Sequence, residues 1–196
     1  GDGKVTSCQY MVDAVSNLFY GMPINGYAAL NMNAVGMIND AVGGVTVTVP
    51  EDMTQVDPSF AEGATVTLTG DQALKFTRYR DTEKDFSNNS RMERQKQYLV
   101  NFMGQAVKAM KADMGLPVSL YQSLTDDMVT NLSLDRSVYL ATEAMDMHFT
   151  ADGIVSLKAK SKKGSVYDEV YVDDDALYDL IIQTFYTEEQ SEGESK

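Results

Sequence analysis

The 196-residue chain has little of several residue types, and each scarcity excludes a class of protein. It contains one cysteine, Cys8, so it can form neither an internal disulfide nor a cysteine-cluster metal site. Its one histidine, His148, leaves no partner for a histidine-based metal site, and its apolar neighbours favour a structural role. Such sparing use of cysteine fits a cytosolic protein, or a bacterial exported protein that makes little use of disulfides.

Basic residues and long apolar runs are scarce too. The chain has 16 Lys and Arg against 29 Asp and Glu, which gives a formal net charge of −13. So acidic a chain lacks the broad basic footprint of a nucleic-acid-binding protein, and we expect no nucleic-acid partner. No apolar run approaches the roughly 18 residues of a transmembrane helix, and no signal peptide is present. The abrupt start at Gly1 indicates a boundary within a longer protein, in which a membrane anchor could lie upstream.

Hydrophobic periodicity predicts an α/β protein of the α+β kind with one sizeable core. Alternating valine and threonine predict strands over 45–49 and 65–69, separated by a polar excursion over 50–63. The runs 24–32, 154–160 and 166–172 are further candidate strands, the last two as a pair. Helical spacing predicts helices over 11–19, 33–42, 71–76, 90–110, 118–129, 136–145 and 174–186.

Two local patterns concern helix starts. Asn33 is the predicted N-terminal cap of the helix that carries Val35 and Ile38. The acidic run 173–175 lacks the glycine and the terminal glutamate of a calcium loop, so we interpret it as the cap of the last helix.

The arginines are unevenly distributed. Four of the five, Arg78, Arg80, Arg91 and Arg94, fall within seventeen residues of an otherwise acidic chain. The planar guanidinium group suits phosphate and carboxylate oxygens and stays charged at any working pH. The window is therefore a candidate site for a phosphorylated ligand.

Local geometry favours a shared site within this window. If 76–80 is extended, Arg78 and Arg80 point to one face, because side chains alternate along a strand. On the helix that follows, Arg91 and Arg94 are at i, i+3, and Gln95 is at i+4 from Arg91. Two arginine pairs joined by the polar loop 81–90 could close on one diphosphate.

Acidic residues in the loop leave two interpretations open. Asp85 could orient an arginine, hold a metal that bridges the phosphates, or take a proton. Alternatively, Asp81, Glu83, Asp85 and Glu93 simply neutralise the arginines on a solvated surface. Spacing alone does not decide between them.

The order of the motifs resembles that of the LytR-CpsA-Psr family of bacterial cell-envelope proteins. The resemblance rests on Asp40 to Val47, Glu62-Gly63, Leu68 to Leu74, Arg78-x-Arg80 and Arg91-x-x-Arg94-Gln95. It is close over residues 21–108 and looser up to the last helix.

The resemblance implies an extracytoplasmic, membrane-anchored enzyme of a bacterium, and it favours a Gram-positive one. Its fold would be a mixed central sheet flanked by helices. Family members transfer a glycopolymer, such as wall teichoic acid or capsule, from a polyprenyl-pyrophosphate carrier to peptidoglycan. A muramic-acid hydroxyl attacks the sugar-linked phosphorus and the lipid phosphate leaves. The complete domain is expected to use Mg²⁺ or Mn²⁺.

The family's pyrophosphate-binding residues match Arg78, Arg80, Asp85, Arg91 and Gln95. In that assignment the arginines and Gln95 hold the phosphate oxygens, with Arg78 and Arg80 at the reacting centre. Asp85 acts as an orienting group or base. Arg94 matches the binding motif too, but could instead serve the fold through ion pairing.

The sequence departs from the family pattern in two ways. Ser87 to Ser90 make the spacing between Asp85 and Arg91 longer than usual, which leaves Asp81 as a reserve candidate. The family's Arg-Asp-Thr segment, its metal-binding carboxylates and its first strands have no counterpart here. We therefore expect the carboxy-terminal part of the domain, a single unit over 1–187 with a disordered acidic tail over 188–196, which binds phosphate weakly and turns over poorly.

A competing function is a non-catalytic module whose arginines bind an anionic wall polymer or a lipid headgroup. Apolar side chains could line a tunnel for a polyprenyl tail or form plain core: Phe19, Tyr20, Phe102, Met103 and Met110. The lysine run 158–163 is interpreted as a solvated hairpin turn that could touch anionic polymer.

Overall fold

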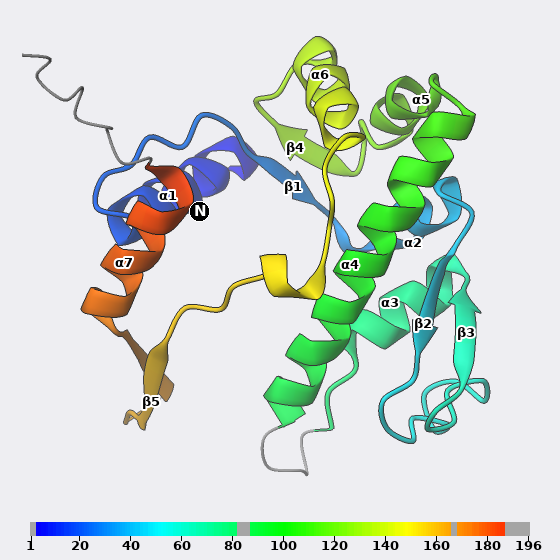
Figure 1. Ribbon diagram of the computed structural model, residues 1–196, viewed down its shortest axis with the longest axis horizontal. Coiled ribbons are helices and arrows are strands. Elements are labelled where there is room, and N and C mark those ends of the chain that lie inside the picture. The colour runs from blue at the N-terminus through cyan, green and yellow to red at the C-terminus, as the bar shows by residue number, and fades with distance from the viewer. Residues whose placement is uncertain (1–2, 82–86, 166–167, 187–196) are drawn as a thin grey trace, which may run out of the picture. The chain divides into compact units, whose positions relative to one another are not determined.

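The computed structural model describes residues 3–81, 87–165 and 168–186 (Figure 1). Contacts divide the chain into two compact units, which are described separately. The first comprises Gly1–Val12 and Ile24–Ile154, and the second comprises Asp13–Pro23 and Val155–Lys196. The predicted tail over 188–196 lies outside the described residues.

Helices and short strands alternate along the chain, which confirms the mixed α/β class. The helices are α1 (Lys4–Leu18), α2 (Met32–Ala41), α3 (Gly70–Arg78), α4 (Ser87–Ala112), α5 (Leu116–Ser123), α6 (Leu134–Ala144) and α7 (Asp174–Phe185), with a 3-10 turn at Ala151–Gly153. Antiparallel pairs are formed by β1 (Ala28–Leu30) with β4 (Met128–Thr130), β2 (Val45–Thr48) with β3 (Thr65–Leu68), and β5 (Ala159–Lys163) with β6 (Asp168–Val172).

Among the described residues these strands form three separate ladders, where the family resemblance implied one central sheet. The outer edge of β2 shows why. The Thr48 amide donates to Gln97 Oε1 at 3.2 Å, and Asn101 Nδ2 donates to the Thr46 carbonyl at 2.9 Å. Because side-chain amides of α4 occupy this edge, α4 takes the place of a third strand beside β2.

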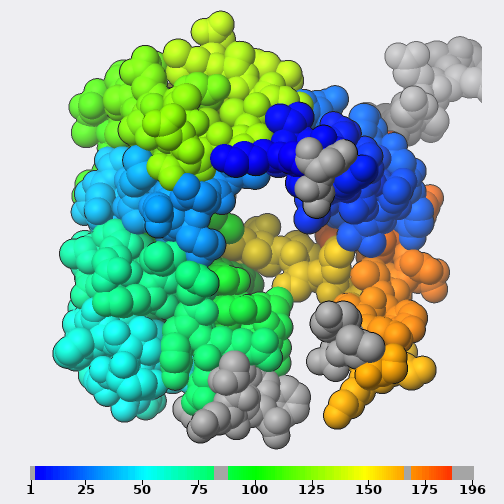
Figure 2. Space-filling view, turned by 180° about the vertical axis from the view of Figure 1, so that it is seen from behind, coloured from blue at the N-terminus to red at the C-terminus, as the bar shows by residue number. Residues whose placement is uncertain are grey.

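The core of the first unit lies between the β2–β3 pair, α3 and α4. Val45 and Val47 on β2 are buried while the threonines between them are exposed, as the alternating pattern predicts. The segment 50–63, predicted as a polar excursion, also contributes to the core, because Met53 and Phe60 are both 0% exposed. Phe60 packs edge-on against Phe76 of α3, with 5.8 Å between ring centroids. In the space-filling view the cyan and teal residues of β2, β3 and α3 lie directly against the green residues of α4 (Figure 2).

Two residues without large side chains set the close crossing of α2 and α3. A Cβ on Gly70 would lie 2.6 Å from Asp40 Oδ2 and 2.8 Å from the Gly36 carbonyl oxygen. The buried Asn39 completes this junction by donating to the Leu68 carbonyl at 2.7 Å and accepting from the Val45 amide at 3.3 Å. These contacts fix α3, and with it Arg78, against the strands.

Several predicted boundaries are corrected. The cap of α2 is Asn31, whose Oδ1 accepts from the Asn33 amide at 2.8 Å, so Asn33 lies inside the helix. The predicted helix over 118–129 ends at Ser123, and Met128 begins β4. Only pairing with β1, about a hundred residues earlier, makes that segment a strand, so no local pattern could show it.

The second unit contains the β5–β6 hairpin and α7. The pairing of the two strands is confirmed, although β5 begins at Ala159, later than predicted. Lys160, Lys162 and Lys163 of the lysine run lie on strand β5 and not in a turn, and every β5 side chain is exposed. The capping role of the acidic run is confirmed, since Asp173 accepts from the Ala176 amide at 3.1 Å.

Candidate functional site

The arginine window begins at the end of α3. Ala73 and Phe76 are buried on one side of this helix, whereas Arg78 is its last residue and is exposed. The extended conformation expected over 76–80 is therefore wrong for Arg78, because the helix continues two residues beyond Phe76. Tyr79 ends the helix, and Arg80 lies beyond it with an exposed side chain. The two arginines are thus presented by a helix end and the turn after it, and not by one face of a strand.

The first turns of α4 are attached to this end of α3. Gln95 Nε2 donates to the Thr77 carbonyl at 3.0 Å, and Arg94 Nε donates to the Phe76 carbonyl at 3.1 Å. Both acceptors belong to the last turn of α3, whose carbonyls lack partners within the helix. The amide and guanidinium groups of α4 thus cap α3 and fix the place of Arg78 next to the start of α4.

Arg94 is the buried member of the window, with 1% of its surface exposed. Besides Phe76, it donates through Nη1 to Glu51 Oε1 at 2.5 Å and through Nη2 to the Tyr79 carbonyl. Its guanidinium carbon also lies 5.7 Å from the centre of the Tyr79 ring. Three of its donor groups are therefore satisfied by the protein itself.

Arg91 differs in its surroundings. Its Nη2 donates to Asn88 Oδ1 at 2.6 Å, one turn earlier on α4. Its Nε is buried and has no acceptor among the described residues. A buried donor without a partner is costly, and in proteins such groups mark sites where a ligand or water supplies the acceptor. Arg91 therefore keeps hydrogen-bonding capacity that Arg94 has used.

The start of α4 corrects the predicted loop 81–90. The helix begins at Ser87, so Asn88 and Ser90 form its first turn instead of lengthening a loop. The free amides of the helix start consequently belong to residues before Arg91, which lies in the second turn. Asp85 lies outside the described residues, so its part in the site stays a prediction. The reserve candidate Asp81 is half-buried.

Burial and neighbouring charges act together on the pKa of Arg94 at this junction. Burial lowers the pKa of Arg94 most strongly, and the nearby charge of Arg91 lowers it further. Glu51 opposes both effects. The charge of Arg91 therefore lies close enough to affect the pKa of Arg94, and the Glu51 carboxylate binds Arg94.

Sequence reasoning missed two residues of this junction, Glu51 and Asn88. Asn88 carried a usable signal, because it is three residues before Arg91, a helical spacing. Glu51 carried none, because it is 43 residues from Arg94 and meets it only in the folded chain.

A metal site would require several carboxylate, histidine or cysteine side chains that converge. Across 3–81, 87–165 and 168–186, no group of three or more His, Cys, Asp or Glu side chains converges in a way that could hold a metal ion. The described residues by themselves therefore offer no site for Mg²⁺ or Mn²⁺, and metal use by the complete domain stays a prediction. No helix in the described part of the chain is both long and apolar enough to cross a bilayer.

The five candidates for a lipid tunnel do not line one cavity. Phe102 and Met110 line a cavity of about 230 Å³ between α4, α5 and α6, and Phe102 stacks on Tyr98 with 6.1 Å between ring centroids. Met103 lines another hollow of the first unit, on α4 near Phe149. Phe19 and Tyr20 belong to a groove of the second unit.

The first unit thus defines a class of protein, an α/β domain in which arginine side chains gather where α3 meets α4. A sequence profile of the LytR_cpsA_psr family matches residues 4–182. The chain therefore belongs to the LytR-CpsA-Psr family, and the predicted resemblance is confirmed.

Curated relatives match parts of the chain. The polyisoprenyl-teichoic acid–peptidoglycan teichoic acid transferase TagU of Bacillus cereus (strain AH820) is 48% identical over 75 residues, which are 37% of this chain and 24% of TagU. TagU of Halalkalibacterium halodurans is 30% identical over 129 residues, 65% of this chain and 40% of that protein. The chain therefore covers less than half of the length of these relatives.

Solved structures share the fold. The Lin1025 protein from Listeria innocua superposes with a TM-score of 0.63 at 27% identity, over 88% of this chain and 73% of that one. B. subtilis TagV superposes with a TM-score of 0.67 at 20% identity, over 92% and 71%.

Proposed function

We propose that this chain is part of a phosphotransferase that attaches a polyprenyl-pyrophosphate-linked glycopolymer of the teichoic acid or capsule type to peptidoglycan. Family membership and the transferase names of the TagU relatives support this proposal. The enzyme would act at the cell surface of a Gram-positive bacterium, anchored in the membrane by a segment outside this chain.

One observation carries the proposal. The last turn of α3 and the third turn of α4 are joined by the hydrogen bond from Gln95 to Thr77, which brings the Arg78 and Arg91 segments together. Arg78 is exposed, and Arg91 retains a buried Nε without an acceptor in the described residues. A pyrophosphate offers negatively charged acceptor oxygens, which guanidinium donors bind strongly.

The roles follow from these positions. Arg78 and Arg91 would bind the pyrophosphate oxygens, with Arg80 at the edge of the site and the Gln95 amide beside them. Arg94 would hold α3 and α4 together and act on the ligand only through them, because its donors are bound to Glu51 and to backbone carbonyls.

The proposed reaction is a single phosphoryl displacement. The acceptor hydroxyl of peptidoglycan forms a bond to the sugar-linked phosphorus, while the bond from that phosphorus to the lipid phosphate breaks. Asp85 would take the hydroxyl proton, and the lipid phosphate would leave with the bonding electrons. Charge neutralisation and positioning by arginine are what such a loose transition state requires. In the complete domain Mg²⁺ or Mn²⁺ would add to that neutralisation.

Calorimetric titration with geranylgeranyl pyrophosphate tests the binding site. Arg78→Ala and Arg91→Ala should each weaken binding about tenfold or more, as expected for loss of a charge-assisted hydrogen bond. Arg136→Ala is the matched control, because Arg136 is exposed on α6 outside the window. If wild type fails to bind, or if all three variants weaken binding equally, the proposed site is wrong.

A second assay separates enzyme from binder. The protein is incubated with lipid-linked polymer and peptidoglycan, and released polyprenyl phosphate is measured. Release that Arg91→Ala abolishes supports transfer. Binding without any release, also in a version of the protein that includes its upstream sequence, would favour the non-catalytic module.

A further inference from the structure

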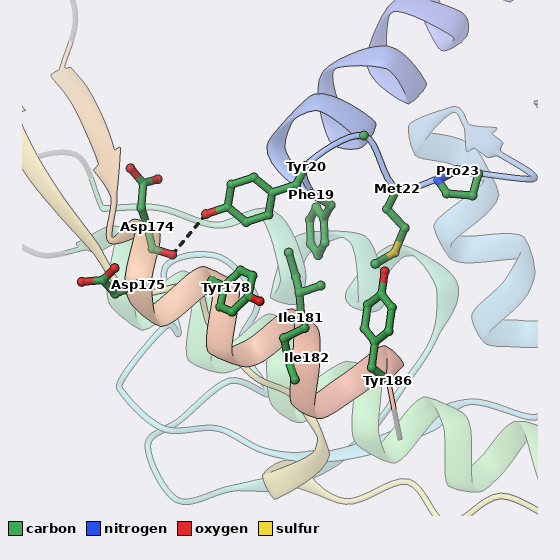
Figure 3. A pocket seen from close by; sticks show the side chains of 11 residues that line it. Phe19, Tyr20, Met22, Pro23, Asp174, Asp175, Tyr178, Ile181, Ile182 and Tyr186 are labelled. Carbon is green, nitrogen blue, oxygen red and sulfur yellow. Dashed lines mark hydrogen bonds between the residues drawn. The ribbon is translucent and has the colours of Figure 1, made fainter. Parts of the chain in front are cut away.

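The second unit contains a groove that the proposed reaction does not use. It lies between the turn that follows α1 and one side of α7, and its volume is about 780 Å³ (Figure 3). Sites for small molecules and short peptides commonly measure a few hundred to a thousand Å³. Its apolar wall includes Phe19, Ile181 and Ile182. A groove of this size and apolarity favours a ligand with apolar side chains.

Two tyrosines form one end of the groove. Tyr20 has a left-handed backbone with φ of 54°, and Gly21 follows with φ of 80°, so the chain reverses and the Tyr20 ring lies beside α7. Its hydroxyl donates to the Asp174 carbonyl at 3.2 Å. The Tyr20 and Tyr178 rings are inclined at 64°, with 6.3 Å between centroids. Their faces at this end suit a cationic group.

Carboxylates stand at the same end. Asp174 and Asp175 line the groove, and both are exposed on the first turn of α7. Asp173 is different, because its carboxylate caps the helix through the Ala176 amide and does not line the groove. Partial desolvation raises the pKa of Tyr20 most, and the charges of Asp174 and Asp175 raise it further. The field of the two carboxylates therefore reaches the ring. Two carboxylates beside two aromatic rings are complementary to an ammonium or guanidinium group.

The other end of the groove is apolar. Met22 and Tyr186 lie there, away from the two aspartates (Figure 3). From Asp175 to Tyr186 the helix rises about 16 Å. An extended peptide rises about 3.3 Å per residue, so roughly five residues span that length. The hydroxyls of Tyr178 and Tyr186 along the wall offer hydrogen-bond partners to a peptide backbone, which an alkyl chain would not use.

We propose that this groove binds an extended basic peptide segment, with a lysine or arginine side chain at Asp174 and Asp175 and a large apolar side chain between Met22 and Tyr186. The tyrosine pair contacts the cation from the side, and the apolar wall buries the residues between. The groove lies wholly within the second unit, so the proposal does not depend on the arginine site.

The test is an NMR titration of the whole chain with the peptide acetyl-Lys-Ala-Leu-Ala-Phe-amide. We expect a Kd on the order of 0.1 mM, with shifts confined to residues of the groove. Replacing both groove carboxylates, Asp174→Asn with Asp175→Asn, should weaken binding about tenfold, because two exposed charge contacts are lost. Asp173→Asn removes a charge from the same turn without touching the groove and keeps a good helix cap, so it should change Kd less than about threefold.

Ligand controls complete the design. A peptide with Glu in place of Lys should not bind measurably, and one with Ala in place of Phe should bind several-fold more weakly. The proposal is overturned if the lysine peptide does not bind, if Asp173→Asn weakens binding as much as the double variant, or if the glutamate peptide binds equally well. Hexylamine that binds as tightly as the peptide would also overturn it, since the peptide backbone would then contribute nothing.

Discussion

Arg91 and Arg94 lie less than one turn apart on the same helix, yet they belong to two different regions of the molecule. Arg94 is buried, with donors on Glu51, Phe76 and Tyr79. Arg91 contacts Asn88 and keeps a buried Nε without an acceptor in the described residues. The inner region stabilises the junction of α3 and α4, and we propose that the outer region binds a ligand.

Arg91 and Arg94 therefore show that two residues of one motif can have different surroundings and different roles. Residues three apart on a helix differ by about 60° around its axis, which is enough to turn one side chain into the core and the other to its rim. Arg94 is paired with Glu51, and we propose that a phosphate oxygen supplies the acceptor that Arg91 Nε lacks among the described residues.

Removing Arg94 should have the largest effect on stability. Arg94→Ala leaves the Glu51 carboxylate and two carbonyls without their donor, so we expect the free energy of unfolding to fall by about 3 kcal/mol. Arg94→Lys should lose nearly as much, because one ammonium cannot reach three acceptors in different directions. Urea unfolding measures both, and a loss below about 0.5 kcal/mol for Arg94→Ala would show that its contacts are not structural.

Shifting α3 should affect both regions at once. In Gly70→Ala the new Cβ meets Asp40 Oδ2 at 2.6 Å and the Gly36 carbonyl oxygen at 2.8 Å. Overpacking of this kind typically costs about 2 kcal/mol, and α3 must move away from α2. We expect lower stability in urea and weaker pyrophosphate binding in calorimetry. Unchanged binding with lowered stability would show that the place of Arg78 does not depend on this crossing.

Gln95 connects the two regions, and its loss should be smaller. Gln95→Ala removes the donor to the Thr77 carbonyl, an exposed contact worth about 1 kcal/mol. Gln97→Ala is a matched control, because that side chain accepts from β2 instead of contacting α3. Pyrophosphate binding should weaken in Gln95→Ala and hold in Gln97→Ala. Equal weakening in both would assign the effect to α4 as a whole.

A further predicted effect concerns alkaline pH. Burial, and to a lesser degree the charge of Asp40, raises the pKa of Tyr98 to about 12, above the ordinary value of 10.0. The folded state therefore keeps this proton, and the resulting stability is complete below about pH 10 and is lost as the pH rises toward 12. In Tyr98→Phe the fall in stability over that range should be shallower. Unfolding by urea at pH 9 and at pH 11 checks the difference, and equal slopes would contradict it.

Sequence alone predicted the parts of this structure that depend on neighbours in the chain. Alternation identified β2 with its buried Val45 and Val47, and the acidic run was correctly read as the cap of α7. The extent of α3 was not predictable, because the residues after Phe76 are polar and remain helical through carbonyl contacts with Arg94 and Gln95. Those contacts exist only after α4 has docked.

For the candidate site, the sequence likewise indicated the features that depend on chain neighbours and not the contacts between distant residues. The arginine cluster and the family were visible in the sequence, and the profile match confirms the family. The sequence does not separate the roles of Arg91 and Arg94, because the difference depends on Glu51, which is 43 residues from Arg94. The position of Glu51 shortly after β2 does not indicate a contact with Arg94.

We propose that Arg94 serves the fold and Arg91 the ligand, and a comparison of two variants checks both roles at once. Arg91→Ala and Arg94→Ala are compared by urea unfolding and by titration with geranylgeranyl pyrophosphate, under identical conditions. The account predicts that Arg91→Ala keeps its free energy of unfolding within about 0.5 kcal/mol and loses binding, whereas Arg94→Ala loses about 3 kcal/mol. Arg91→Ala binding as tightly as wild type, or losing as much stability as Arg94→Ala, would contradict it.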